Sequence, residues 1–61
     1  MIDIKTIRLK TGLSQQEFGE RYNIPVASIR DWEQGRRKCP EYVTELLDFR
    51  VEFDIKEGEE P

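Results

Sequence analysis

The stretch SQQEFGERYNIPVASIRDWEQG, which begins at Ser14, constrains the fold more than any other part of the sequence. Ser14 and Glu17 have the S-x-x-E spacing of a capping box, in which each side chain bonds a backbone N–H that the first helical turn leaves free. Phe18 and Tyr22 follow four residues apart, on one face of a helix. The pattern therefore predicts a helix over residues 15–22.

A tight break separates this helix from a second one. Asn23 tolerates the positive φ with which many helices end, and Pro25 cannot continue a helix but fits the start of the next. Ile29 and Trp32 then lie three residues apart, so they share one face of a helix. The sequence predicts this helix over about 26–34, with the Ile29 side buried.

The residues on either side predict two further helices. Asp3 suits an N-cap and Gly12 suits a left-handed helix end, which together predict a helix over residues 4–11. Pro40 suits the first position of a fourth helix, which we expect to continue to about Phe53. The predicted fold class is all-α, a compact four-helix domain.

Two patterns overlap in the C-terminal part of the sequence. A helical stripe is formed by Tyr42, Leu46, Phe49 and Phe53. A strand-like alternation with charged residues is formed by Phe49, Val51, Phe53 and Ile55. We favour an extended fourth helix and keep a short C-terminal strand as the alternative. The remaining apolar residues that we expect to close the core are Val43, Leu46 and Leu47.

The charges are unevenly divided along the chain. Its net charge is −3, but residues 1–40 carry a net +3 and residues 41–61 a net −6. Because salt limits the reach of surface charges to about 10 Å, the first forty residues can attract a polyanion although the whole chain is acidic. We expect one domain over 1–53 and an acidic, disordered tail over 54–61.

The composition argues against several functional classes. The chain has no histidine and one cysteine, Cys39, which removes the usual metal-ligand clusters, histidine-dependent nucleophiles and an intrachain disulfide. No apolar run reaches the roughly 20 residues of a membrane span, and the N-terminus does not have the pattern of a signal peptide. We expect a cytoplasmic protein that is not an enzyme, needs no cofactor, and has no catalytic or metal site.

Two segments, IRLKTGLSQQEF and SIRDWEQGRRKCP, give the chain a resemblance to a known family. From Ile4 to about Leu47, the sequence resembles the Cro/repressor-type (XRE-like) helix-turn-helix family of phage repressors and small bacterial regulators. It departs from the family at Gly19, where Ala is usual, and at Asn23, where Gly is common. The resemblance implies a sequence-specific DNA-binding transcriptional regulator.

The resemblance places the helix over 26–34 in the major groove of double-stranded DNA, which is wide enough for one helix. Arg30 would contact guanine, and Asp31 would either accept a hydrogen bond from cytosine or orient Arg30. Side chains of the following loop would contact phosphates. The expected DNA-binding residues are Gln15, Val26, Ala27, Ser28, Arg30, Asp31, Gln34, Arg36, Arg37 and Lys38.

The same resemblance assigns Arg8 and Glu33 to a structural ion pair that joins two helices. We expect the regulator to bind its operator as a homodimer, because the apolar C-terminal residues need a cover. The expected dimer interface consists of Tyr42, Leu46, Phe49 and Phe53. The alternative is a protein-interaction module, such as an antitoxin or accessory subunit, whose acidic C-terminal segment binds a second protein and whose DNA binding is secondary or lost.

Overall fold

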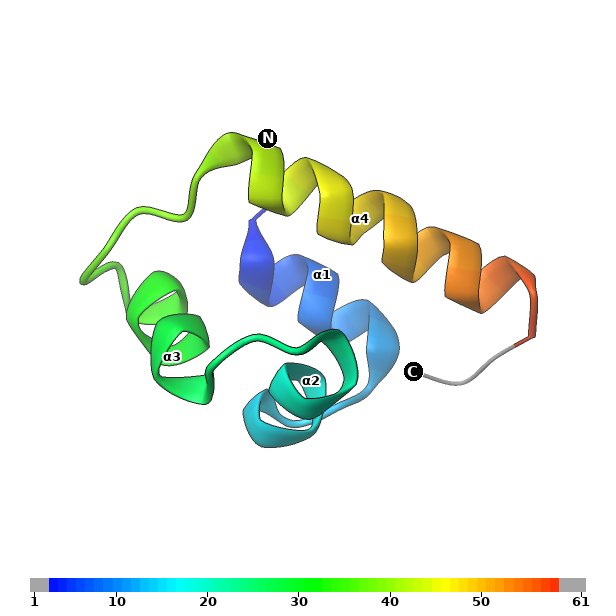
Figure 1. The fold of residues 1–61 in the computed structure, drawn as a ribbon, viewed down its shortest axis with the longest axis horizontal. Coiled ribbons are helices and arrows are strands. Elements are labelled where there is room, and N and C mark those ends of the chain that lie inside the picture. The colour runs from blue at the N-terminus through cyan, green and yellow to red at the C-terminus, as the bar shows by residue number, and fades with distance from the viewer. Residues whose placement is uncertain (1–2, 59–61) are drawn as a thin grey trace.

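The computed structural model describes residues 3–58, and these contain four α-helices (Figure 1). They are α1 (Ile4–Thr11), α2 (Gln15–Tyr22), α3 (Val26–Gln34) and α4 (Glu41–Lys56). The predicted all-α fold and the predicted spans of the first three helices are confirmed. Residues 49–56 belong to α4, so they form a helix and not the strand that was kept as an alternative.

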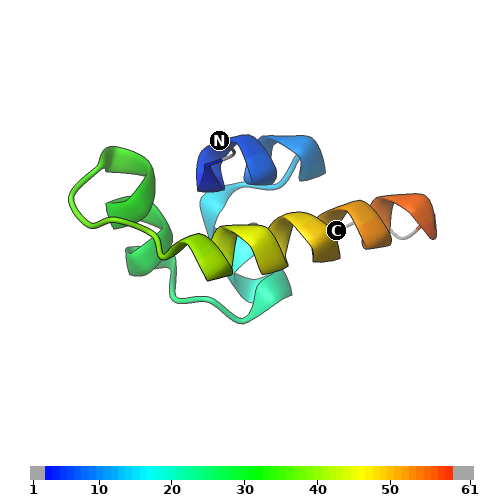
Figure 2. The same cartoon turned by 90° about the horizontal axis from the view of Figure 1, so that it is seen from above.

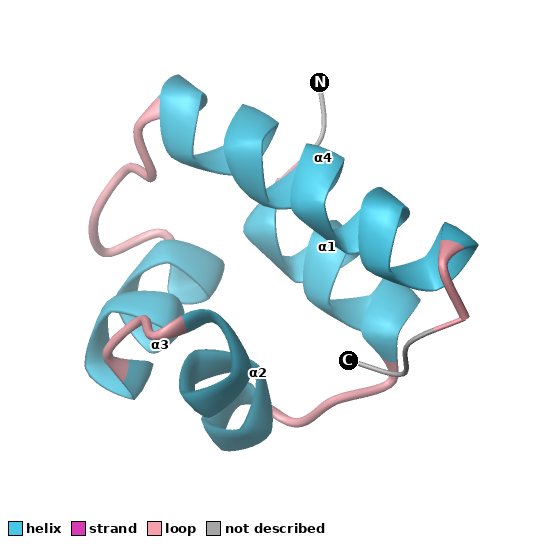
Figure 3. Ribbon diagram, turned by 45° about the vertical axis from the view of Figure 1, so that its right-hand side comes forward, coloured by secondary structure: helices cyan, strands magenta, loops and turns pink. Residues whose placement is uncertain are grey.

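The helices form a body that measures 33 × 23 × 16 Å along its principal axes. α4 runs along the length of the molecule, and α1 lies against it (Figures 1 and 2). α2 packs on α3, and α1 also contacts α3, so that α1 connects the two pairs (Figure 3). Within the described residues, none of the helices has both the length and the apolar character that crossing a membrane requires.

Local hydrogen bonds define the ends of α1 and α2. The Asp3 carboxylate accepts from the backbone N–H of Thr6 at 2.8 Å, which caps α1. At the start of α2, Ser14 and Glu17 form the predicted capping box with bonds of 3.1 and 3.0 Å. Asn23 ends α2 in the left-handed conformation, with φ 59°. These bonds satisfy N–H groups that a helix end otherwise leaves without partners.

The connection between α2 and α3 depends on a close backbone approach at Gly19. The backbone N–H of Ile24 donates to the carbonyl of Gly19 at 2.9 Å. A Cβ atom at Gly19 would lie 2.6 Å from the Ile24 carbonyl oxygen and 3.3 Å from Cδ1 of Ile29. Because Gly19 has no side chain, the turn can fold back over α2. A methyl group at this position would obstruct the turn.

The core is small and draws on all four helices. Its fully buried apolar side chains are Ile4, Ile7, Phe18, Ile29 and Val51. Partly buried side chains pack around them, namely Leu13, Tyr22, Ile24, Trp32 and Leu47. The rings of Phe18 and Tyr22 also pack together in a tilted arrangement, with centroids 4.9 Å apart and an interplanar angle of 50°. The predicted burial of the Ile29 face of α3 is confirmed.

α4 differs from its sequence-based prediction in two respects. It continues three residues beyond the expected end at Phe53, to Lys56, and it buries Val51, which the strand-like alternation grouped with exposed residues. Leu46 was expected in the core but is 66% exposed. The reason is the register of the buried face, which passes through Thr44 and Val51 and leaves Leu46 on the outside.

Asp54 lies at the position where the acidic tail was expected to begin, yet its side chain is fully buried. The helix that carries it packs against the body of the molecule, so the folded part of the chain extends beyond the predicted boundary at 53. The last part of the predicted tail, residues 59–61, lies outside the described residues.

Candidate nucleic-acid interface

α3 has an inner face toward the core and an outer face toward solvent. Ile29 is buried and Trp32 packs partly against the core. Ala27 and Gln34 are exposed on the opposite side, and Arg30 is exposed on one flank of that surface. The α3–α4 loop continues from the end of this helix along the edge of the molecule (Figure 1). α3 thus presents an uncovered face of polar and small side chains.

Gly35 turns the chain back toward α3 after the helix ends. It adopts φ 79°, in the left-handed region that suits a glycine. The next two backbone N–H groups, of Arg36 and Arg37, donate to the carbonyl oxygen of Asp31 at 2.9 and 3.3 Å. This local geometry explains why the basic loop stays next to the outer face of α3.

Side chains make further contacts between the loop and the helix. The Asp31 carboxylate lies 3.4 Å from Nε of Arg37 and 3.9 Å from Nη1 of Arg36. Arg37 also donates from Nη2 to the hydroxyl of Ser28 at 3.0 Å. In the described part of the chain, Arg30 forms neither a hydrogen bond nor an ion pair, and the arginines that Asp31 contacts are those of the loop. Of the two roles expected for Asp31, the orientation of Arg30 is not seen in this structure.

Apart from Gln15, which lies on α2, the predicted contact residues lie on α3 and the loop after it. Ala27, Arg30 and Gln34 are exposed on the helix, and Ser28 and Asp31 are half-buried beside the loop. Val26 is half-buried at the start of α3 and lines a shallow surface hollow together with Asn23 and Pro25. The exposed cations of the loop are Arg36, Arg37 and Lys38.

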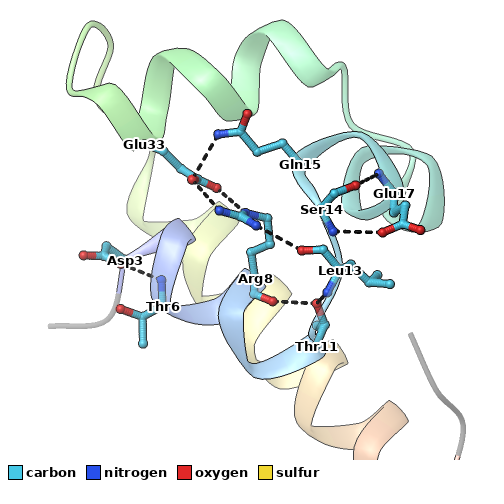
Figure 4. A network of polar contacts seen from close by, with 9 residues as sticks. All are labelled: Asp3, Thr6, Arg8, Thr11, Leu13, Ser14, Gln15, Glu17 and Glu33. Carbon is cyan, nitrogen blue, oxygen red and sulfur yellow. Dashed lines mark hydrogen bonds and ion pairs between the residues drawn. The ribbon is translucent and has the colours of Figure 1, made fainter.

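A polar network behind this region joins α1, α2 and α3 (Figure 4). Arg8 donates from Nε and Nη2 to the two carboxylate oxygens of Glu33, at 2.7 and 3.0 Å. Arg8 also donates from Nη1 to the Leu13 carbonyl at 3.0 Å. The side chains of Arg8 and Glu33 are 13% and 5% exposed, so water screens the pair little.

Gln15 belongs to the same network. Its amide donates to Oε1 of Glu33 at 3.1 Å, so in the unbound protein this amide points inward (Figure 4). The hydrogen bonds from Arg8 hold the pKa of Glu33 below its ordinary value and outweigh its burial, which acts in the opposite direction. The bonds to Glu33 likewise raise the pKa of Arg8. The network fixes the start of α2 relative to α3.

A second network, which the sequence analysis missed, surrounds Asp54. The Tyr22 hydroxyl donates to Oδ2 of Asp54 at 2.9 Å, and Nε of Arg50 lies 3.1 Å from Oδ1. Arg21 approaches Oδ2 to 3.6 Å. The spacing of Leu47, Val51 and Asp54, four and three residues apart, could have indicated that Asp54 shares the buried face of α4.

Part of the acidic charge on α4 is neutralised within the molecule. Nζ of Lys10, on α1, donates to Asp48 at 3.0 Å and to Glu52 at 2.9 Å. Asp54 is surrounded by Arg21 and Arg50. Figure 1 shows the C-terminal half of α4 at the opposite end of the molecule from α3. The carboxylates in the C-terminal half of α4 are thus separated from the outer face of α3.

The side chains of this region are suited to binding another molecule. Among residues 3–58 no group of three or more His, Cys, Asp or Glu side chains is placed to hold a metal ion. Burial raises the pKa of the Cys39 thiol, which makes it a poorer nucleophile at neutral pH. The guanidinium groups on α3 and the loop are suited to hydrogen bonds with phosphates and base edges.

Comparison with known proteins identifies one family. A family model described as helix-turn-helix matches residues 4–43, which is more than half of the chain. The match includes α1, α2 and α3, the basic loop and the first residues of α4. No curated protein and no solved structure matches the chain.

Proposed function

We propose that this chain, which belongs to the helix-turn-helix family of the Cro/C1 type, recognises a specific operator sequence as a homodimer. The family consists of DNA-binding regulatory domains, and the chain is a DNA-binding regulator of the helix-turn-helix type. The operator, the pairing of two copies and the roles of single residues are the parts of this function that we infer.

The outer face of α3 carries the proposal. The B-DNA major groove is about 12 Å wide and admits one helix, whose exposed side chains then reach base edges. Arg30 is exposed and has no partner within the described residues, so its guanidinium can bond O6 and N7 of guanine without first breaking an internal contact. Ala27 and Val26 lie at the start of α3, and there they would contact thymine methyl groups.

Phosphate contacts come from the ends of α2 and α3. Arg36, Arg37 and Lys38 are exposed on the loop, and Gln34 lies directly before it. Gln15 lies at the N-terminus of α2, where partial positive charge favours a phosphate. These contacts position α3 and strengthen binding to every sequence, whereas the base contacts select the operator.

The homodimer follows from the exposed stripe of α4, which we define as Tyr42, Leu46, Phe49 and Phe53. These side chains are 66%, 66%, 75% and 48% exposed. Their spacing of four, three and four residues is that of a helix seam that packs against another helix. A single chain of this size has little core, and covering the stripe would add to it.

A second copy of this chain fits the stripe best. A twofold axis brings the same apolar face together from both chains, so that the interface is complementary to itself. A palindromic operator with half-sites about 34 Å apart requires two α3 helices related by such an axis. The acidic half of α4 would then lie at the dimer axis, away from the loop cations.

Two measurements on the full chain test this function. Selection from a random DNA pool should enrich a palindrome, and sedimentation at micromolar concentration should show a dimer. A pool without enrichment contradicts operator binding, and a monomer contradicts the homodimer. If the chain enriches no sequence but binds a different protein through the stripe of α4, the function is that of an interaction module such as an antitoxin or accessory subunit.

A further inference from the structure

The carboxylate of Asp31, half-buried beside the basic loop, lies within the surface that we place against DNA. Ala27, Asp31 and Gln34 are spaced by four and three residues, so they share the face of α3 opposite Ile29. The duplex carries one negative charge per about 1.7 Å of its axis, and a carboxylate in this position opposes binding. The position of Asp31 therefore requires a function other than attraction to DNA.

The contacts of Asp31 in the unbound protein neutralise it. Arg37 lies 3.4 Å away and Arg36 lies 3.9 Å away, both on the basic loop. These arginine side chains are 58% and 71% exposed, and ion pairs this open to water are weak. A phosphate can consequently take either arginine from Asp31, and Arg37 can leave the Ser28 hydroxyl for the same partner.

The consequence of losing the arginines depends on the base that Asp31 then meets. Cytosine and adenine each present an amino group in the major groove, N4 and N6, which can donate a hydrogen bond to a carboxylate. Guanine presents two acceptors, O6 and N7, and thymine presents O4 and a methyl group, none of which can donate. On those bases the carboxylate would be unpaired and close to phosphates, and the complex would be weakened.

We propose that Asp31 is a specificity-determining residue that lowers the affinity for non-cognate DNA. On the operator, its carboxylate accepts from an amino group and replaces the loop arginines, which bind phosphates. On other sequences, the arginines either stay with Asp31 and give up phosphates, or leave it unpaired. This inference rests on the proposed function, because it requires that α3 enters the major groove.

The test compares Asp31→Asn with wild type on a random-sequence duplex and on the operator obtained by selection with the wild-type chain. Asn has nearly the shape of Asp but no charge. We expect Asp31→Asn to bind random duplex about three- to tenfold more tightly near 0.1 M salt, with a salt slope steeper by about one. Its preference for the operator over random duplex should fall by at least the same factor.

Glu57→Gln is the matched control, because it removes the same charge from the exposed C-cap residue of α4. It should leave the ratio of operator to random affinity unchanged. Adding Arg37→Ala to Asp31→Asn should remove part of the gain on random duplex, since the released arginine is one source of that gain. Asp31→Ala provides a second variant with the same expected direction.

The result that overturns this inference is an Asp31→Asn protein that binds random duplex no more tightly than wild type. A purely structural Asp31 would instead lower both affinities together, and thermal unfolding of the variant would show the loss. Failure of the proposed function is a separate result. It would appear as the absence of a preferred sequence for the wild-type chain, before any variant is compared.

Discussion

The hydroxyl of Tyr22 donates a hydrogen bond of 2.9 Å to Oδ2 of Asp54 and so joins the end of α2 to the last turns of α4. Asp54 is fully buried, and its Oδ1 atom accepts no hydrogen bond from the described residues although Nε of Arg50 lies 3.1 Å away. Burial would raise the pKa of Asp54, but Tyr22, Arg50 and Arg21 outweigh it and hold the pKa below its ordinary value. The buried carboxylate is thus kept charged by the groups around it.

Tyr22→Phe tests the contribution of this bond. A hydrogen bond to a charged group contributes about 1.5–3 kcal/mol, and in a domain of this size each kcal/mol corresponds to roughly 4–8 °C in Tm. We expect a lower Tm by thermal unfolding. Tyr42→Phe is the control: it removes a hydroxyl from a tyrosine that is exposed within one chain, and it keeps the ring that the proposed dimer would cover, so Tm should stay nearly unchanged. Equal melting of Tyr22→Phe and wild type would show that the bond adds no stability.

Acid should destabilise the protein through Glu33 and Asp54. The pKa of each lies below its ordinary value, 4.5 for Glu33 and 3.8 for Asp54, so the unfolded chain binds their protons more readily than the folded chain does. Their contribution is present above those values and is lost as the pH falls through the lower folded pKa. The midpoint of urea unfolding should therefore decrease between about pH 5 and pH 3.

Glu33→Gln distinguishes the contribution of Glu33 to acid sensitivity from that of Asp54. The variant leaves Arg8 without its carboxylate partner. Because the side chains of the pair are little exposed, the free energy of unfolding should fall by about 3 kcal/mol or more at neutral pH. Acid should also lower the stability of the variant less than that of wild type, because Gln does not titrate. DNA binding should weaken only in proportion to the unfolded fraction. A variant with unchanged stability but lost binding would show that Glu33 contacts DNA.

Gly19→Ala should destabilise the turn between α2 and α3. Replacing a helical Gly by Ala normally stabilises by about 1 kcal/mol, but here the new Cβ would lie 2.6 Å from the backbone oxygen of Ile24. Such overpacking costs about 1–3 kcal/mol, so we expect a net decrease in the free energy of unfolding by urea denaturation. Gln16→Ala, at an exposed position of α2, is the control. A more stable Gly19→Ala protein would contradict the close approach.

Arg30 and Arg37 should differ in what they contribute to DNA binding. Arg30→Ala should cost about 1–3 kcal/mol at one base pair of each half-site and relax the preference there, whereas binding to random duplex changes little. Arg37→Ala should weaken binding to all sequences and lower the salt slope by about one. Fluorescence anisotropy with operator, single-substitution and random duplexes measures both effects. Equal losses on operator and random duplex for Arg30→Ala would refute base contact by this residue.

Phe49→Asp should separate the proposed dimer into folded monomers. Burying one Phe side chain contributes about 1.5–3 kcal/mol, and a twofold interface contains it twice, so dimerisation should weaken by about a hundredfold or more. Helical circular dichroism should persist, because Phe49 is 75% exposed within one chain. Leu9→Asp, an equally polar change at an exposed apolar residue of α1, should remain dimeric. Sedimentation in which Phe49→Asp behaves like wild type would place the interface elsewhere.

The sequence alone determined the first three helices because their ends are defined by local interactions. The capping box of Ser14 and Glu17 involves residues three positions apart, and Asn23 and Pro25 restrict their own backbone. Each of these signals acts within one or two helical turns, so it can be read without knowledge of the fold. The family resemblance depends on the same local pattern, and the match over residues 4–43 confirms it.

Only the tertiary structure decided what α4 buries and where the loop cations lie. α4 carries apolar side chains on both its inner and outer surfaces, so its sequence pattern did not indicate that Val51 is buried while Leu46 is exposed. Packing against the other helices determines which of these side chains are buried. It also places Asp54 beside Tyr22, a residue 32 positions earlier in the chain. Asp31 met Arg37 instead of Arg30 because the chain turns back at Gly35. Such contacts join segments whose relative positions depend on the folding of the whole chain, and local patterns carry no information about them.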